Sequence, residues 1–442
     1  MYTHPTILSQ QDSVVDAIRP HLLPLQSPVD LDSLIDHIGS SKIVMLGEAS
    51  HGTHEYYTWR AMISQRLIRE KGFSFIAVEG DWPDCYRLNR YVKNYSGAGD
   101  SAYEVLHSFN RWPTWMWANW EVAAFAEWLY DHNKSIPQNK KAGFYGLDVY
   151  SLWESMEEII KYLRRVDPAA LEIAERAFYC FEPYQGEEGT GYAYASLLVP
   201  EPCTQEVVNL LAEMQRKALK YNTDQENVFS AEQNALIAFN AEKYYRAMLH
   251  GGGETWNIRD THMMETLERL MNFHGKYAKA IVWAHNTHIG DARATDMRRQ
   301  GMHNIGELAR KSYGPDNVSL VGFGSHHGSV VASYRWGEES QHMKVPPAVS
   351  GSWEDMLKKT GIQSGYLLMD NIRDERLKEF EIGHRAIGVV YHPWAEKPGN
   401  YVPSVLPSRY DAFIYLEQTK ALHALHVAPI DNQIPETYPF GV

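Results

Sequence analysis

The sequence predicts an α/β protein with a mostly parallel central sheet flanked by helices and a helical insertion that forms a cap. Two observations carry this prediction. Short, continuous apolar runs bounded by Gly or Asp recur along the chain, as expected of strands buried on both faces of a parallel sheet. Segments whose apolar residues recur with the period of an α-helix separate several of these runs, which favours βαβ units.

The apolar runs are the predicted strands, in chain order. They comprise 42–46, 73–78, 142–147, 280–284, 318–323, 365–369, 387–391 and 412–416. The stretch between the third and fourth runs has little strand signal, and its predicted helices are 152–165, 205–221 and 231–249. We therefore divide the chain into a first part of the core (1–150), a helical insertion (151–275) and a second part of the core (276–442). Within the insertion, the Gly-, Tyr- and Pro-rich segment 182–202 is predicted to be a long loop.

The composition excludes several classes of protein. The 442 residues include 42 Lys and Arg against 55 Asp and Glu, a formal net charge of −13, which argues against nucleic acid or an anionic membrane surface as a partner. The N-terminus has no signal-peptide pattern and no run of about 18 apolar residues occurs, so we expect a cytoplasmic protein without a transmembrane helix. Cys85, Cys180 and Cys203 form no CxxC pair and predict neither a disulfide framework nor a structural zinc site.

Acids and histidines follow the predicted strands at the positions where an open parallel sheet binds its ligands. Ligands lie outside the carboxyl ends of such strands. The residues at these ends are Glu48 and His51 after the first run, Glu79 after the second, Asp148 after the third, and His285 and His288 after the fourth. We therefore expect these side chains to converge on one site.

Glu48 and His51 are the central pair. A carboxylate beside an imidazole fixes its tautomer and raises its pKa, which makes a general base near neutral pH. Gly47 before them allows a tight turn off the strand. The alternative is a histidine at a helix start that only hydrogen-bonds the backbone. Glu79 has no capping role because Asp81 is the better helix cap, so Glu48 and Glu79, on strands expected to be adjacent, could share a water or one proton.

Other chemistries have weaker support. His285 and His288, like His51 and His54, are three residues apart and could bind a metal on a helix, or could be loop histidines bonded to backbone. The chain has no HExxH motif and no dense ligand cluster, so we expect no cofactor and keep a metal as the alternative. It also lacks the GxSxG, Walker A and GxGxxG motifs. The tryptophans of segment 111–128 could line the binding site of a large apolar or sugar-bearing ligand, although core packing accounts for at least half of them.

Five segments together resemble the erythromycin esterase family. They are GEASHGTHE at 47–55, AVE at 77–79, the stretch 256–265 beginning WNIRD, WAHNTH at 283–288 and YDAFIY at 410–415. The resemblance implies a metal-independent bacterial hydrolase with helical additions to an α/β core. The best-known members of this family open the macrolactone ring of erythromycin-type antibiotics, and other relatives are labelled succinoglycan biosynthesis proteins.

The resemblance also implies roles for particular residues. His51 matches the general base that activates water. The other positions that it marks as important are Glu48, Glu79, His285, His288 and, for substrate binding, Arg60, with Arg259 and Asn257 as weaker candidates. Segment 396–401 (EKPGNY) departs from the family pattern, which leaves the natural substrate open.

Arg60 sets a geometric condition. It lies nine residues after His51, and nine steps of about 100° put the two on opposite faces of a continuous helix. Both reach one site only if the helix begins after His51, nearer Glu55, so we predict a loop at 47–52.

The sequence thus predicts hydrolysis of a small-molecule ester or lactone. His51 takes a proton from water with help from Glu48 and Glu79, and a histidine of the 285–288 motif or Arg60 stabilises the oxyanion. Two alternatives remain: a metal-assisted hydrolase of another ester or acylated saccharide, and a polyketide- or glycan-binding protein without turnover.

Overall fold

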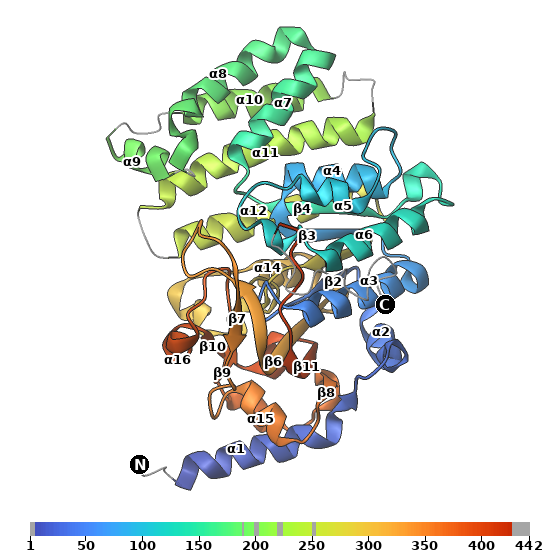
Figure 1. Ribbon diagram of the computed structural model, residues 1–442, viewed down its shortest axis with the longest axis vertical. Helices are drawn as coiled ribbons and strands as arrows, with labels where there is room; N and C mark the ends of the chain where they lie inside the picture. The colour runs from blue at the N-terminus through green and yellow to red at the C-terminus, as the bar shows by residue number, and fades with distance from the viewer. Residues whose placement is uncertain (1–4, 188–189, 199–202, 219–223, 250–252, 427–442) are drawn as a thin grey trace.

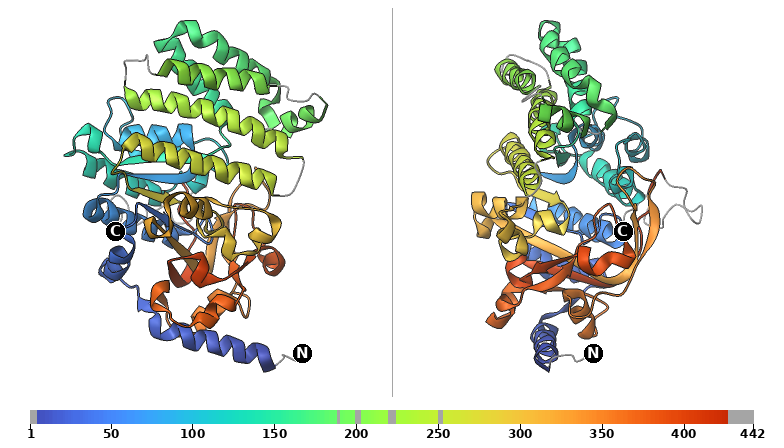
Figure 2. Two further views of the ribbon diagram at one scale, coloured as in Figure 1. Left: turned by 180° about the vertical axis from the view of Figure 1, so that it is seen from behind. Right: turned by 90° about the vertical axis from the view of Figure 1, so that its left-hand side faces the viewer.

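A computed structural model describes residues 5–187, 190–198, 203–218, 224–249 and 253–426 (Figure 1). A central sheet lies between helices, and a stack of further helices stands at the end of the molecule opposite the N-terminal helix (Figures 1 and 2). The predicted α/β architecture with a mostly parallel sheet is therefore confirmed. Among the described residues, no helix is both long enough and apolar enough to cross a membrane.

Nine strands of the described chain form the main sheet, in the order β1-β8-β11-β6-β2-β5-β3-β4, with β7 paired to β6. The strands from β11 to β4 run parallel, whereas β1 and β8 join antiparallel at one edge and β7 pairs antiparallel with the last residues of β6. The strand bounds are β1 Leu23–Pro24, β2 Ile43–Leu46, β3 Phe75–Asp81, β4 Gly143–Asp148, β5 Ala280–Trp283, β6 Val318–Ala332, β7 Gln341–Val345, β8 Ser364–Leu368 and β11 Ala412–Thr419; β9 Ile382–Arg385 and β10 Tyr401–Ser404 form a separate hairpin.

The α-helices connect these strands and build the insertion. Their bounds are α1 Pro5–Ile18, α2 Asp32–Ile38, α3 His54–Lys71, α4 Trp82–Val92, α5 Ala102–His107, α6 Trp120–Asn133, α7 Leu152–Val166, α8 Leu171–Phe181, α9 Thr190–Leu198, α10 Thr204–Ala218, α11 Gln225–Ala247, α12 Glu254–His274, α13 Asn286–Ile289, α14 Ile305–Tyr313, α15 Trp353–Lys359, α16 Glu396–Gly399 and α17 Leu406–Arg409.

The continuous apolar runs arise because helices cover both faces of the sheet. In β2, Val44 and Leu46 pack into the core that contains α3 and α6, while Ile43 and Met45 pack into the core that contains α12 and α14. Alternate side chains of one strand thus enter different apolar layers, so no position is left for a polar residue. Helices α7 to α11 form a third core of their own beside the sheet.

Two element predictions are wrong. Residues 387–391 are no strand: Ile387 makes an isolated bridge to Ser50, and its neighbours β9 and β10 pair with each other instead. Ile387 and Tyr391 are apolar because they pack under β6 and β7, and periodicity cannot separate that burial from a strand. Segment 182–202 is no long loop where it is described, because 182–187 is a 3₁₀ helix and 190–198 is α9.

The cysteine prediction also needs correction. Cys180, on α8, is disulfide-bonded to Cys203, just before α10, and Cys85 is buried and free. The two partners are separated by 23 positions in the sequence and no spacing motif marks them. The fold of the insertion brings them together, so spacing alone gave no sign of the pair.

Candidate active site

A turn after β2 holds His51 against Glu48. The turn spans 47–53 and α3 begins at His54, so the predicted helix start is confirmed. The Nδ1 atom of His51 lies 2.9 Å from Oε1 of the buried Glu48. Gly47 is needed for close approach and not for a left-handed turn, because a Cβ there would lie 2.1 Å from Oδ1 of Asn286.

Arg60 completes this arrangement from the second turn of α3. Its Nη2 atom donates to Oε2 of Glu48 at 2.6 Å, and both side chains have no solvent exposure. The guanidinium also lies over the rings of Tyr57 and Trp283. Arg60 therefore lies on the far side of Glu48 from His51 and contacts the histidine only through this carboxylate.

Glu79 belongs to a second charged group and does not meet Glu48. Strand β5 lies between β2 and β3, so the expected adjacency of the two strands is wrong, and the hydrogen bonds of the two carboxylates have no partner in common among the described residues. Glu79 lies where β3 departs from regular pairing with β4, an irregularity that redirects a side chain. Its carboxylate accepts hydrogen bonds from Arg259 at 2.7 Å and from the backbone N–H of His285 at 2.8 Å.

Arg259, on α12, connects Glu79 to the end of β4. It forms two bonds to Asp148, from Nε to Oδ1 at 2.9 Å and from Nη2 to Oδ2 at 2.6 Å. Although burial opposes it, the positive charges of His288 and Arg259 hold the pKa of Glu79 well below its usual value. This group therefore keeps its carboxylates ionised at neutral pH.

The surroundings of His288 raise its pKa, in contrast to those of His285, and Nη1 of Arg259 lies 2.9 Å from its Nε2. Nδ1 of His288 lies 3.0 Å from both oxygens of Asp260, and Nε2 lies 3.3 Å from Glu79. Burial alone would lower its pKa, but the charges of Asp260 and Glu79 raise that pKa to about 9. The ring of Trp256 stacks on His288 with centroids 4.5 Å apart.

His285 lies beside His51, with ring centroids 4.9 Å apart. Burial, followed by the neighbouring His51, holds the pKa of His285 well below its usual value, so the ring is neutral. Its Nδ1 atom lies 2.8 Å from Oγ1 and 3.3 Å from the backbone nitrogen of Thr287. His285 thus provides His51 with a neutral neighbour.

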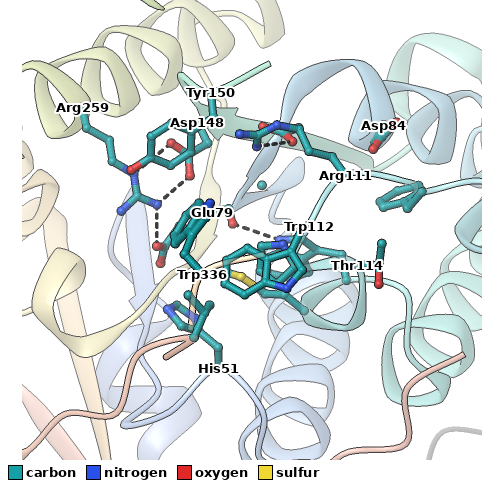
Figure 3. A pocket seen from close by; sticks show the side chains of 17 residues that line it. His51, Glu79, Asp84, Arg111, Trp112, Thr114, Asp148, Tyr150, Arg259 and Trp336 are labelled. Carbon is teal, nitrogen blue, oxygen red and sulfur yellow. Dashed lines mark hydrogen bonds and ion pairs between the residues drawn. The ribbon is translucent and has the colours of Figure 1, made fainter. Parts of the chain in front are cut away.

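One cavity joins His51 to the second charged group (Figure 3). Figure 3 shows Glu79 between His51 below it and Arg259 and Asp148 above it, with Trp112 and Thr114 to the right. The residues that line it are His51, Glu79, Gly80, Asp81, Asp84, Phe109, Arg111, Trp112, Pro113, Thr114, Met116, Trp117, Asp148, Tyr150, Arg259, Trp336 and Val389. The lining therefore combines charged and polar side chains with five aromatic ones.

A further polar group lines the same cavity. Arg111 donates to Asp81 at 3.0 Å and lies over the ring of Tyr150. Burial raises the pKa of the neighbouring Asp84 to about 6. This part of the cavity can hold a polar portion of a ligand away from His51.

The predicted site residues separate into those that line the cavity and those behind it. His51 and Glu79 line it, whereas Glu48, Arg60, His285 and His288 hold the lining residues from behind. Asn257 lies elsewhere and bonds the backbone of Gly301 and His303.

Three residues have a larger part in the site than the sequence indicates. The sequence marks Arg259 as a weak candidate and Asp148 as the end of a strand, and it gives Asp260 no role. Their signal was present, since Asp148 ends a buried strand and Arg259 and Asp260 are neighbours in one motif segment. Of the tryptophans in 111–128, Trp112 and Trp117 reach the cavity, while Trp115 is buried in the core.

Comparisons with known proteins identify the family of the chain. An erythromycin esterase family model matches residues 68–419. Erythromycin esterase type II of Escherichia coli is 23% identical over 369 residues, which cover 78% of this chain and 85% of that protein.

Solved structures share the fold. A succinoglycan biosynthesis protein superimposes with a TM-score of 0.76 at 20% identity, over 94% of this chain and 99% of the other. A Bacillus cereus protein gives 0.75 at 19% identity over the same shares. A variant of the erythromycin esterase EreC, in its open conformation, gives 0.65 at 14% identity over 89% and 95%. By the family match across most of its length, the chain belongs to the erythromycin esterase family.

Proposed function

We propose that the protein hydrolyses an ester or lactone of a small molecule, with His51 as the general base. The observation that carries the proposal is a series of contacts at the cavity. Arg60 bonds Glu48, Glu48 bonds His51, and His51 lines the cavity. Family membership supports a hydrolase of this type.

The proposed first step is removal of a proton from water by His51. Nδ1 faces Glu48, which accepts the N–H of that nitrogen, so Nε2 carries the lone pair. Tyr57 holds the backbone of the same turn by donating to the carbonyl of His51 at 2.8 Å. A general base of this kind contributes about 10²- to 10⁴-fold to a rate.

The water oxygen then attacks the ester carbonyl, and the carbonyl oxygen gains negative charge. Arg259 is the cation that lines the cavity beside Glu79, and we assign it to this oxyanion, with the charge of His288 behind it. When the tetrahedral intermediate collapses, the His51 imidazolium returns its proton to the leaving alkoxide. The products are an alcohol and a carboxylic acid, which loses its proton to solvent, and the enzyme regains its starting charge.

The residues that line the cavity suit a substrate with both apolar and polar parts. Trp112 and Trp336, with centroids 4.5 Å apart, offer ring surface, whereas Arg111 and Asp84 offer hydrogen bonds. Macrolides and acylated sugars both fit this description, and the assay must choose between them.

The test is a hydrolysis panel of macrolides, simple lactones and acylated sugars, followed by mass spectrometry. The wild-type protein is expected to add one water to at least one substrate, and His51→Ala to lose at least about 100-fold in kcat. His132→Ala, on α6 and outside the cavity, is the matched control and should retain the activity. Unchanged hydrolysis by His51→Ala would contradict the assigned base, and intact substrates throughout would favour a binding protein.

A further inference from the structure

Outside the cavity, two histidines bind the same carboxylate oxygen. His54 begins α3, Glu121 lies in the first turn of α6, and His423 lies on the segment after β11. Oε1 of Glu121 is 2.6 Å from Nδ1 of His54 and 2.7 Å from Nδ1 of His423. Their ring centroids are 5.2 Å apart, in an edge-to-face arrangement. None of the three lines the cavity of His51.

Glu121 is a buried carboxylate held by these two histidines. Within the described part of the chain, its ion-pair partners are these two histidines, and the backbone N–H of His423 is the further donor to its oxygens.

The three ligand atoms suit a divalent transition metal. Two imidazole nitrogens and one carboxylate oxygen are a common zinc ligand set with a fourth position for water. They lie within 4.8 Å of one another, the one such grouping of three among the described residues. Metal–ligand distances of about 2.0–2.2 Å in a tetrahedral site put ligand atoms about 3.3 Å apart, so the pairs must open by roughly 0.6 Å. His423, whose side chain is 41% exposed, offers a route for exchange with solvent.

We propose that His54, Glu121 and His423 form a binding site for a divalent transition metal of the Zn²⁺ type, separate from the cavity. The site joins three segments that are distant in the sequence. The segment after β11 already crosses the His51 turn, because Leu422 N–H donates to the Gly52 carbonyl at 3.1 Å and His54 N–H donates to the Lys420 carbonyl at 2.9 Å. A bound metal fastens this segment to the start of α3 and raises the thermal stability of the protein.

The experiment uses the full chain without a histidine tag, stripped with EDTA and then freed of chelator. Zn²⁺ is titrated by calorimetry, and Tm is measured with and without Zn²⁺. We expect one Zn²⁺ per chain, reversal by EDTA and a rise in Tm. His423→Ala and His54→Ala should each weaken binding at least about tenfold, since even an outer-shell partner contributes 10- to 100-fold. His132→Ala, on the same helix as Glu121, should bind like the wild type.

The partly exposed His423 makes His423→Ala the decisive variant, because it can be checked for wild-type secondary structure and melting in the absence of metal. Three results would overturn the proposal. They are no stoichiometric binding by the wild type, full affinity in both histidine variants, and loss of binding in His51→Ala with retention in His423→Ala. The last result would place the metal in the cavity.

Discussion

Replacing Arg60 by Met tests whether this arginine acts through Glu48 or on the substrate. The arginine and the carboxylate are both fully buried and 2.6 Å apart. Met fills similar apolar space between Tyr57 and Trp283 but leaves Glu48 as a buried charge without its arginine. Removing one partner of a buried pair costs about 3–5 kcal/mol of unfolding free energy.

The size of the effect on Tm follows from chain length. An unfolding entropy of about 2.1 cal/mol/K per residue, over 442 residues, converts that loss into a decrease in Tm of about 3–5 °C. Arg66→Met is the matched control, since Arg66 lies on the same helix and pairs at the surface with Asp32 and Glu70. Such surface pairs contribute about 0–1 kcal/mol, so the control should melt within about 1 °C of the wild type.

The kinetic effect separates the two roles. If Arg60 fixes Glu48 and thereby His51, then Arg60→Met lowers kcat by about 100-fold, the usual effect of a misplaced catalytic group, and leaves KM nearly unchanged. The double variant Arg60→Met with Glu48→Gln should regain stability, because the buried charge is then absent. The reasoning is refuted if Arg60→Met melts like Arg66→Met, or if it raises KM at constant kcat, which would make Arg60 a substrate-binding residue.

Three further predictions follow from the structure. Because folding raises the pKa of His288 from 6.5 to about 9, its stabilising contribution of roughly 3 kcal/mol is complete below pH 6.5 and lost as the pH rises through 9; urea unfolding at a series of pH values should show this slope in the wild type, and an equal slope in His288→Asn would contradict it. A Cβ on Gly52 would lie 1.9 Å from the carbonyl oxygen of Val331, so Gly52→Ala should lower the unfolding free energy by about 1–3 kcal/mol and reduce hydrolysis, and a fully active, equally stable variant would show that the turn tolerates the contact. Cys203→Ser removes the bond to Cys180 and should lower stability by about 2–4 kcal/mol; an identical urea midpoint in both proteins would show that the disulfide is absent or neutral.

The strands and the first charged pair were predictable because their signals are local. A strand covered by helices on both faces must be apolar at every position, so runs such as Ile43–Leu46 and Ala280–Trp283 predict a parallel sheet directly. The condition that His51 and Arg60 reach one site also fixed the helix start, because helical geometry relates residues nine positions apart. The run 387–391 was misread because burial under another element gives the same composition as a strand.

Contacts between distant segments were decided only by the tertiary structure. Strand order is not written in the sequence, so the insertion of β5 between β2 and β3, which separates Glu48 from Glu79, could not be foreseen. Arg259 lies on α12, and the packing of this helix against the sheet sets the angle between them. Only this packing brings the Arg259 side chain to Glu79 and Asp148. The chain by itself therefore determined which residues end the strands, whereas the fold decided which charges meet, because pairing between segments depends on the total packing energy and not on local pattern.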